Sequence, residues 1–113
     1  MTKGASGFAT GNVNVSLQVL PRAEGTDIYD LVDRAIGVIQ ASGVPYEVGP
    51  METTMEGDYD ELMAIAKEAL EGCMDAGADR IVALIKLDWK RGGLTADEKI
   101  GKYRAGFRAD HVA

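Results

Sequence analysis

The sequence predicts a single α+β domain in which two helices cover one face of a four-stranded antiparallel sheet. Three observations lead to this prediction: a strictly alternating apolar run near the N-terminus, two amphipathic helical stretches, and a strand–helix–strand order that occurs twice. The chain has 113 residues, enough for one domain but too few for two. At this length about two-thirds of the unfolded surface can be buried, so one ordinary core is feasible.

The first element is a half-buried strand over residues 13–20, VNVSLQVL. Its odd-numbered residues are all apolar, and Asn14, Ser16 and Gln18 alternate with them. This pattern is typical of a strand with one covered and one open face. We expect Pro21 to end the strand.

An amphipathic helix comes next, with apolar residues at the i, i+3, i+4, i+7 spacing. Thr26 or Asp27 can cap its start. Ser42 and Gly43, followed by Pro45, mark its end, because glycine suits the left-handed position after a helix.

Two short strands are predicted over residues 46–49 and 53–56, around a turn at Gly49-Pro50. Parity with the neighbouring strands directs Tyr46 and Val48 towards the helices.

The second half of the chain repeats the strand–helix–strand order. A helix is predicted from Asp58, with Glu61 placed as in a capping box, to Gly77. Residues 81–87, IVALIKL, form the most continuous apolar run, which is typical of a central or well-covered strand. After a Gly-Gly break, a capping box at residues 95–98 predicts a last helix.

This order indicates a ferredoxin-like βαββαβ sandwich with an extra C-terminal helix. Right-handed crossovers leave room for the third strand between the first and second, which gives an antiparallel sheet of order 4-1-3-2 with both long helices on one face. We expect a flexible N-terminal tail over residues 1–11, the domain over residues 12–104, and a C-terminal tail or helix end over residues 105–113.

Composition argues against several classes of function. The net charge of −6 is unfavourable for a nucleic-acid partner, which requires a basic patch. No apolar run approaches the ~18–20 residues of a membrane span, and the N-terminus lacks the apolar segment of a secretory signal. Because Cys73 is the only cysteine, we expect no disulfide or cysteine-based zinc site, and a cytoplasmic location.

The alternation of side chains along each strand places both polar and apolar residues on the sheet face opposite the helices. This set consists of Ser16, Gln18, Glu47, Thr54, Glu56, Val82, Leu84 and Lys86. A partly apolar face of this size is more often packed against a second subunit than left in water. Its polar groups then need partners, because an unpaired buried polar group costs about 1–3 kcal/mol. An internal network with Lys86 and a pocket for a polar ligand both satisfy this need.

No convincing set of catalytic residues is present. His111, the only histidine, lies near the chain end, where a catalytic triad would require it to fold back. Asp58 and Asp60 stand at a helix start, where capping explains them better than a metal does. Glu47 and Glu56 could act as general acid and base, although two solvated carboxylates explain the pair equally well. We therefore predict no catalytic residue, metal or cofactor.

The runs YEVGPM at residues 46–51 and TTMEGD at residues 53–58 resemble the thiamine-binding protein family, which consists of small ferredoxin-like domains. The resemblance covers residues 12–104, and its further matches are Ser16, Pro21, the run IKLD at residues 85–88, Thr95 and Lys99. It implies a homo-oligomer, typically a tetramer of sheet-to-sheet dimers, that binds thiamine or its hydroxymethylpyrimidine moiety without known catalysis. Glu52 departs from the family, in which glycine is usual, and adds a negative charge beside the implied site.

The implied ligand fits the residues of the open face. An aminopyrimidine has an exocyclic amine donor and ring-nitrogen acceptors, so it needs matched acceptors and hydroxyl donors. Ser16, Thr54 and Glu56 can supply these, with Glu47 as a further acceptor, and the two carboxylates can offset a thiazolium charge. The family motif adds Met51 and Thr53 near the turn, although parity directs Thr53 inward.

The leading hypothesis is therefore a cytoplasmic, non-enzymatic binding protein that serves as a carrier, buffer or sensor. One alternative is an oligomeric interaction module without a small-molecule ligand. A second alternative is an enzyme that acts on a small pyrimidine or cationic substrate through Glu47 and Glu56.

Overall fold

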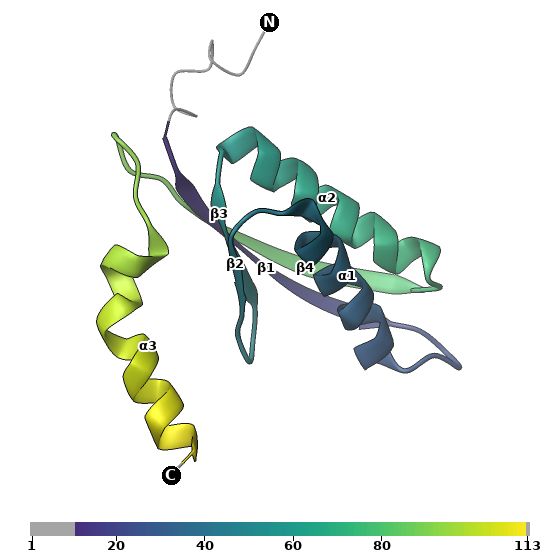
Figure 1. Ribbon diagram of the computed structural model, residues 1–113. Coiled ribbons are helices and arrows are strands. Elements are labelled where there is room, and N and C mark those ends of the chain that lie inside the picture. The colour runs from purple at the N-terminus through teal and green to yellow at the C-terminus, as the bar shows by residue number, and fades with distance from the viewer. Residues whose placement is uncertain (1–10, 113) are drawn as a thin grey trace, which may run out of the picture.

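The computed structural model describes the backbone of residues 11–112 and the side chains of residues 11–104. Its elements, in chain order, are β1 Val13–Arg22, α1 Ile28–Ser42, β2 Tyr46–Val48, β3 Thr53–Gly57, α2 Tyr59–Asp75, β4 Arg80–Asp88 and α3 Ala96–Val112 (Figure 1). The predicted N-terminal tail falls almost entirely outside the described residues. Residues 105–112 continue α3.

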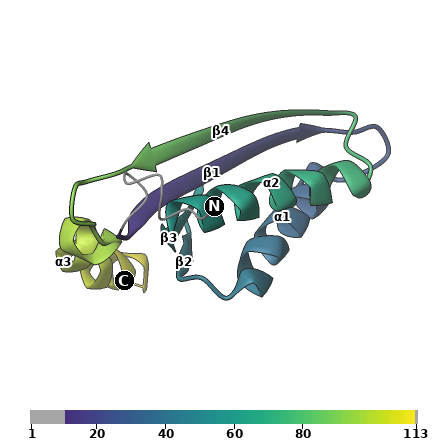
Figure 2. The ribbon, with the colours of Figure 1, turned by 90° about the horizontal axis from the view of Figure 1, so that it is seen from above.

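The four strands form one antiparallel sheet in the order β2-β3-β1-β4, which is the predicted order 4-1-3-2. Helices α1 and α2 lie side by side on one face of this sheet, and α3 lies beyond the end at which β1 begins and β4 ends (Figure 2). The ferredoxin-like prediction is therefore confirmed.

The core lies between β1, β3 and the two packed helices. Val13, Val15 and Leu17 of β1 are buried there, as their alternation predicts, together with Met55 of β3. The helices contribute apolar side chains at helical spacing: Leu31, Ala35, Ile39, Leu62, Ile65, Ala66, Ala69 and Cys73.

The helix ends follow their sequence signals. Asp27 caps α1 by accepting a hydrogen bond from the backbone N–H of Tyr29 at 2.9 Å, and Gly43 ends the helix with φ at 83°. Asp58 caps α2 by accepting from the N–H of Glu61 at 3.1 Å. These caps fix where each helix leaves the sheet.

The prediction that Pro21 ends the first strand is wrong, because β1 continues through Arg22. Pro21 stands opposite Ile81 in the ladder between β1 and β4. Since β3 pairs with β1 only as far as Leu17, no described strand pairs with β1 on that side at Pro21. Proline is tolerated in such an edge-like stretch.

The prediction that residues 81–87 form a central or well-covered strand is also wrong for the described chain. Strand β4 lies at the edge of the sheet and pairs only with β1. Leu84 is 46% exposed, and Val82, Ile85 and Leu87 are similarly exposed. The apolar run therefore lies on a surface that the described residues leave largely open.

Tyr46 and Val48 lie on the helix-side face, but they are not core residues. Their exposed fractions are 38% and 50%, because β2 is a three-residue strand at the other edge of the sheet. Their partners on β3, Met55 and Thr53, are the buried members of these two pairs.

Replacing two glycines by alanine tests the assigned end of α1. The two substitutions should change the free energy of unfolding in opposite directions. Gly43→Ala places a side chain at a left-handed φ and should lower the free energy of unfolding by about 1 kcal/mol. Gly37→Ala, within α1 and facing open space, should raise it by about 1 kcal/mol. Urea unfolding followed by circular dichroism at one protein concentration measures both, and shifts of equal sign would contradict the assigned end of α1.

Candidate functional site

The open sheet face brings polar side chains of three strands together. Ser16 on β1 stands opposite Thr54 on β3 and, on its other side, Lys86 on β4. Glu47 on β2 stands opposite Thr54. The alternation of the strands therefore gathers four of the polar residues that the sequence placed on this face.

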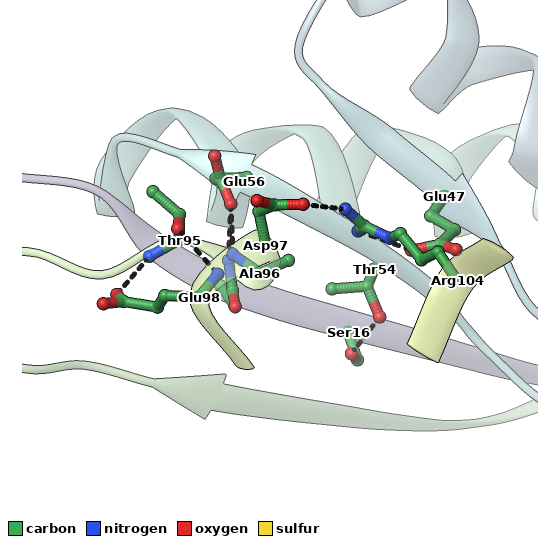
Figure 3. A network of polar contacts seen from close by, with 10 residues as sticks. Ser16, Glu47, Thr54, Glu56, Thr95, Ala96, Asp97, Glu98 and Arg104 are labelled. Atoms are coloured by element: carbon green, nitrogen blue, oxygen red, sulfur yellow. Dashed lines mark hydrogen bonds and ion pairs between the residues drawn. The ribbon is translucent and has the colours of Figure 1, made fainter. Parts of the chain in front are cut away.

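A hydroxyl pair lies at the centre of this face. The Oγ of Ser16 and the Oγ1 of Thr54 are 2.7 Å apart, a hydrogen bond in which either hydroxyl can donate (Figure 3). Because one hydroxyl donates to the other, the pair still offers one proton and free lone pairs to a third group.

Glu56 connects this face to α3. Its Oε1 accepts a hydrogen bond from the backbone N–H of Ala96, the first residue of α3, at 2.6 Å (Figure 3). A reciprocal capping box supports the same turn, since Thr95 N–H donates to Glu98 and Glu98 N–H donates to Thr95. Glu56 thus satisfies one of the N–H groups that a helix start leaves unpaired.

Asn14 neighbours Glu56 and is 4% exposed. Its Nδ2 donates to Glu56 Oε1 at 3.4 Å, whereas its Oδ1 accepts no hydrogen bond from any residue that the structure describes. Buried acceptors are nearly always paired in folded proteins, so this oxygen is an unusual feature of the site.

Glu47 is held by α3 from the other side. Its Oε1 accepts from Nη2 of Arg104 at 2.8 Å, and Nη1 of Arg104 donates to Asp97 Oδ1 at 3.1 Å (Figure 3). The hydrogen bond to Glu47 is the main cause that raises the pKa of Arg104 above its ordinary value. Arg104 therefore bridges a strand carboxylate and a carboxylate of its own helix.

Two further ion pairs border the face. Lys86 Nζ lies 2.9 Å from Glu52 Oε1, and Lys99 Nζ lies 2.6 Å from Asp88 Oδ2. Glu52, the residue that departs from the family pattern, therefore has a cationic partner across the sheet. Exposed pairs of this kind contribute little to stability, about 0–1 kcal/mol.

Contiguous hollows lie between this face and α3. The first, which we call the sheet hollow, measures about 310 Å³ and is lined by Asn14, Ser16, Glu47, Thr54, Lys86, Asp88, Lys99 and Ile100, among others. The second, the turn hollow, measures about 650 Å³ and is lined by Glu47, Val48, Gly49, Pro50, Ile100, Tyr103 and Arg104. A third hollow of about 400 Å³ beside Glu56 shares Glu47 and Thr54 with the sheet hollow and Arg104 with the turn hollow. Glu47 lines all three.

The six predicted ligand residues do not all line the same hollow. Ser16, Glu47 and Thr54 line the sheet hollow, and Glu56 lines the adjoining hollow while it caps α3. Thr53 is 5% exposed on the helix side, as parity predicts, and borders a different hollow of about 100 Å³ together with the exposed Met51.

Sequence reasoning did not assign Asn14 or Arg104 to the site. Asn14 was recognisable as an open-face residue from the alternation of β1, but its missing partner depends on packing that no local pattern encodes. Arg104 lies 57 residues from Glu47 in the chain, and α3 carries no marked apolar stripe that would have predicted how it docks.

Fold and site together define a class: a ferredoxin-like domain with a polar hollow between its open sheet face and a C-terminal helix. The chain belongs to the thiamine-binding protein family, whose family model matches residues 15–104. The resemblance inferred from residues 46–58 is thereby confirmed.

Relatives of known sequence and structure agree with this assignment. The UPF0045 protein CPE1503 of Clostridium perfringens is 53% identical over 91 residues, which cover 80% of this chain and 96% of that protein. A solved domain of unknown function from Bacillus cereus superposes with a TM-score of 0.80 at 47% identity, covering 83% of this chain and 91% of that one. A Thermotoga maritima structure, described as a candidate thiamine biosynthesis or salvage protein, has a TM-score of 0.76 at 41% identity, covering 82% and 99% respectively.

The described residues also bear on other classes of site. No helix among them is long and apolar enough to cross a membrane. Within the same part of the chain, no three histidine, cysteine or acidic side chains are grouped as a metal ion requires.

The contact between Glu56 and α3 yields a direct prediction. Glu56→Ala should speed amide hydrogen exchange in the first turns of α3 several-fold, because it removes a charge-assisted cap from a helix held mainly by polar contacts. Hydrogen-exchange mass spectrometry of a peptide spanning residues 94–104 measures this. Glu68→Ala, the same change on the exposed surface of α2, is the control and should have no effect there. Equal exchange in both variants would show that Glu56 does not hold α3.

Proposed function

We propose that the protein binds thiamine or its hydroxymethylpyrimidine moiety in the sheet hollow, without catalysis, as a cytoplasmic carrier, buffer or sensor. The observation that carries this proposal is the Ser16–Thr54 hydroxyl pair in a hollow of about 310 Å³ that Glu47 also lines. Membership of the thiamine-binding protein family supports the choice of ligand.

The chemistry of the hollow is complementary to an aminopyrimidine. The exocyclic amine needs acceptors, which Glu47 and the lone pairs of the hydroxyl pair provide, and a ring nitrogen needs the proton that the hydroxyl pair has left.

The structure supports binding over acid–base chemistry. Glu56 is engaged with the N–H of Ala96, and Glu47 is engaged with Arg104. A general acid and base need carboxyl groups that reach the reacting atoms. Here one of the two acts chiefly as a helix cap.

Self-association forms the second part of the proposal. Leu20, Val82 and Leu84 leave an exposed apolar strip on the open face, and β4 has an unpaired edge in the described chain. Apolar patches of this kind and unpaired edges are usually covered by a partner. We propose that a second copy packs on this face in a homodimer or homotetramer, which would further enclose the sheet hollow.

The alternative is an oligomeric interaction module without a ligand. Its support is the series of internal ion pairs, Glu52–Lys86, Asp88–Lys99 and Glu47–Arg104, which satisfies much of the face without any bound molecule. These pairs do not include the Ser16–Thr54 hydroxyl pair, which lines the sheet hollow, and that difference favours a ligand.

Thermal-shift titration tests binding. A ligand present at about 100 times its Kd adds about 2.7 kcal/mol to the free energy of unfolding, so thiamine or hydroxymethylpyrimidine should raise the melting temperature. An unmoved transition at millimolar thiamine, thiamine phosphates and hydroxymethylpyrimidine would leave the interaction module as the better account.

Substitutions of two adjacent threonines test where the ligand binds. Thr54→Val removes a hydroxyl from the sheet hollow and should weaken binding roughly fivefold, the value of one ordinary hydrogen bond. Thr53→Val makes the same change on the helix side of the sheet and should leave affinity unaltered. Calorimetric titration measures the affinity of both variants for the ligand. Equal losses of affinity would place the ligand elsewhere.

The proposal that a second copy packs on the open sheet face predicts that a charge placed there changes the oligomeric state. Leu84→Lys puts a charge in the apolar strip and should shift the protein to monomers in light scattering. Met74→Lys, at an exposed apolar residue of α2 on the other side of the sheet, should leave the assembly intact. A wild-type monomer, or a Leu84→Lys oligomer of unchanged size, would contradict the proposal.

A further inference from the structure

We propose that α3 is a lid over the sheet hollow, held on the strands by charged contacts and released by rising ionic strength. Ala96, Lys99 and Ile100 of this helix line the hollow, so moving α3 uncovers it. Opening and closing of the lid are properties of the chain alone. Their coupling to a ligand rests on the proposed function, in which the ligand lies in the hollow that α3 covers.

The first observation is that charged residues of three different strands hold α3. The contacts are Glu56 of β3 with the N–H of Ala96 at 2.6 Å, Asp88 of β4 with Lys99 at 2.6 Å, and Glu47 of β2 with Arg104 at 2.8 Å. Both ion pairs are partly exposed, so water and dissolved ions compete for each partner. Salt therefore weakens the hold of the sheet on this helix.

The second observation is that α3 has no apolar seam to the sheet. Ile100 is 40% and Tyr103 60% exposed, and no side chain that the structure describes in α3 is buried. Helices α1 and α2, by contrast, each bury a stripe of apolar residues. Such packing supplies most of the stability of a helix in a folded protein. Helix α3 therefore lacks the interaction that would keep it docked once its charged contacts weaken.

The third observation is an oxygen whose burial opposes docking. The Asn14 amide and the Ala96 N–H donate to the same oxygen of Glu56, at 3.4 and 2.6 Å, so the start of α3 lies beside Asn14. Asn14 Oδ1 is buried and accepts no hydrogen bond from any described residue. Water can reach this oxygen when α3 withdraws, and that hydration offsets part of the cost of opening.

The helix can move without unravelling. Leu94 is 5% exposed and its N–H donates to the carbonyl oxygen of Asn12 at 3.0 Å, which anchors the chain directly before α3. The reciprocal hydrogen bonds of Thr95 and Glu98 lie within the helix start and do not involve the sheet. Loss of the Glu56 contact therefore leaves the first turn capped, and the pivot lies between Leu94 and Thr95.

Hydrogen-exchange mass spectrometry of the full chain without ligand, at about 0.02 M and about 0.5 M sodium chloride, tests the lid. The peptide spanning residues 94–104 should exchange several-fold faster at the higher concentration, while peptides of α1 and α2 keep their rates. Equal rates at both concentrations, or an equal increase in all three helices, would overturn the proposal.

Two substitutions should change the exchange of this peptide in opposite directions at low salt. Lys99→Gln removes one ion pair and should speed exchange roughly two- to fivefold. Asn14→Val removes the unpaired oxygen and should slow exchange by at least a similar factor. Lys67→Gln, which breaks the exposed pair with Glu71 on α2, controls for net charge and should have no effect there. Faster exchange in Asn14→Val, or an unchanged rate in Lys99→Gln, would contradict the lid.

Thiamine distinguishes failure of the lid from failure of the proposed function. In the presence of thiamine the 94–104 peptide should be protected at low salt, and thiamine should dissociate faster at high salt in stopped-flow measurements. If calorimetry detects thiamine binding but exchange of the peptide depends on neither salt nor thiamine, the lid is wrong and the binding function stands. If the peptide responds to salt and no thiamine binds, the proposed function fails and the lid stands.

Discussion

The alternation of side chains along β1, with a period of two residues, is the constraint on which the rest of the molecule depends. Among the described strands β1 alone pairs with both β3 and β4, so its register fixes which face the side chains of these two strands occupy. Val13, Val15 and Leu17 turn towards α1 and α2, and the residues between them necessarily turn the other way. A slip of one residue would bury Asn14 and Ser16 in the core and expose the valines. The same alternation that forms the core therefore also assembles the polar face.

The C-terminal helix completes the site through polar contacts. Its first N–H is bound by Glu56, its Lys99 by Asp88, and its Arg104 by Glu47, each from a different strand of the sheet. These contacts are stronger at low ionic strength than at high, and none replaces a packed apolar seam. The hollows beneath α3 thus have one rigid wall, the sheet, and one wall held by exchangeable charges. This arrangement suits a protein that must admit and release a ligand.

Local signals in the sequence were sufficient for most of the fold. Alternation in β1, the caps at Asp27 and Asp58 and the glycine at Gly43 each act over a few residues, and all appear in the structure as expected. Predictions failed where a partner decides the outcome. Pro21 stays within β1 because the pairing of β3 with β1 ends at Leu17, and the apolar run of β4 is exposed because no described element covers it.

The residues of the candidate site show the same difference between local signals, which could be predicted, and long-range contacts, which could not. Parity correctly placed Ser16, Glu47 and Thr54 on one face, since it needs only the strand period. It could not reveal that Glu56 would cap α3, or that Arg104 would reach Glu47 across 57 residues of chain. Both depend on how a helix with little amphipathic character docks, which only the assembled structure shows.

The central claim is that the ligand lies on the open sheet face beneath α3. An amide NMR titration of the ¹⁵N-labelled full chain with thiamine tests it most directly. The account predicts saturable shift changes at Ser16, Glu47 and Thr54 and in the first turns of α3, with the exposed surface of α1 and α2 unaffected. Shift changes concentrated on α1 and around Met51 and Thr53 would contradict it.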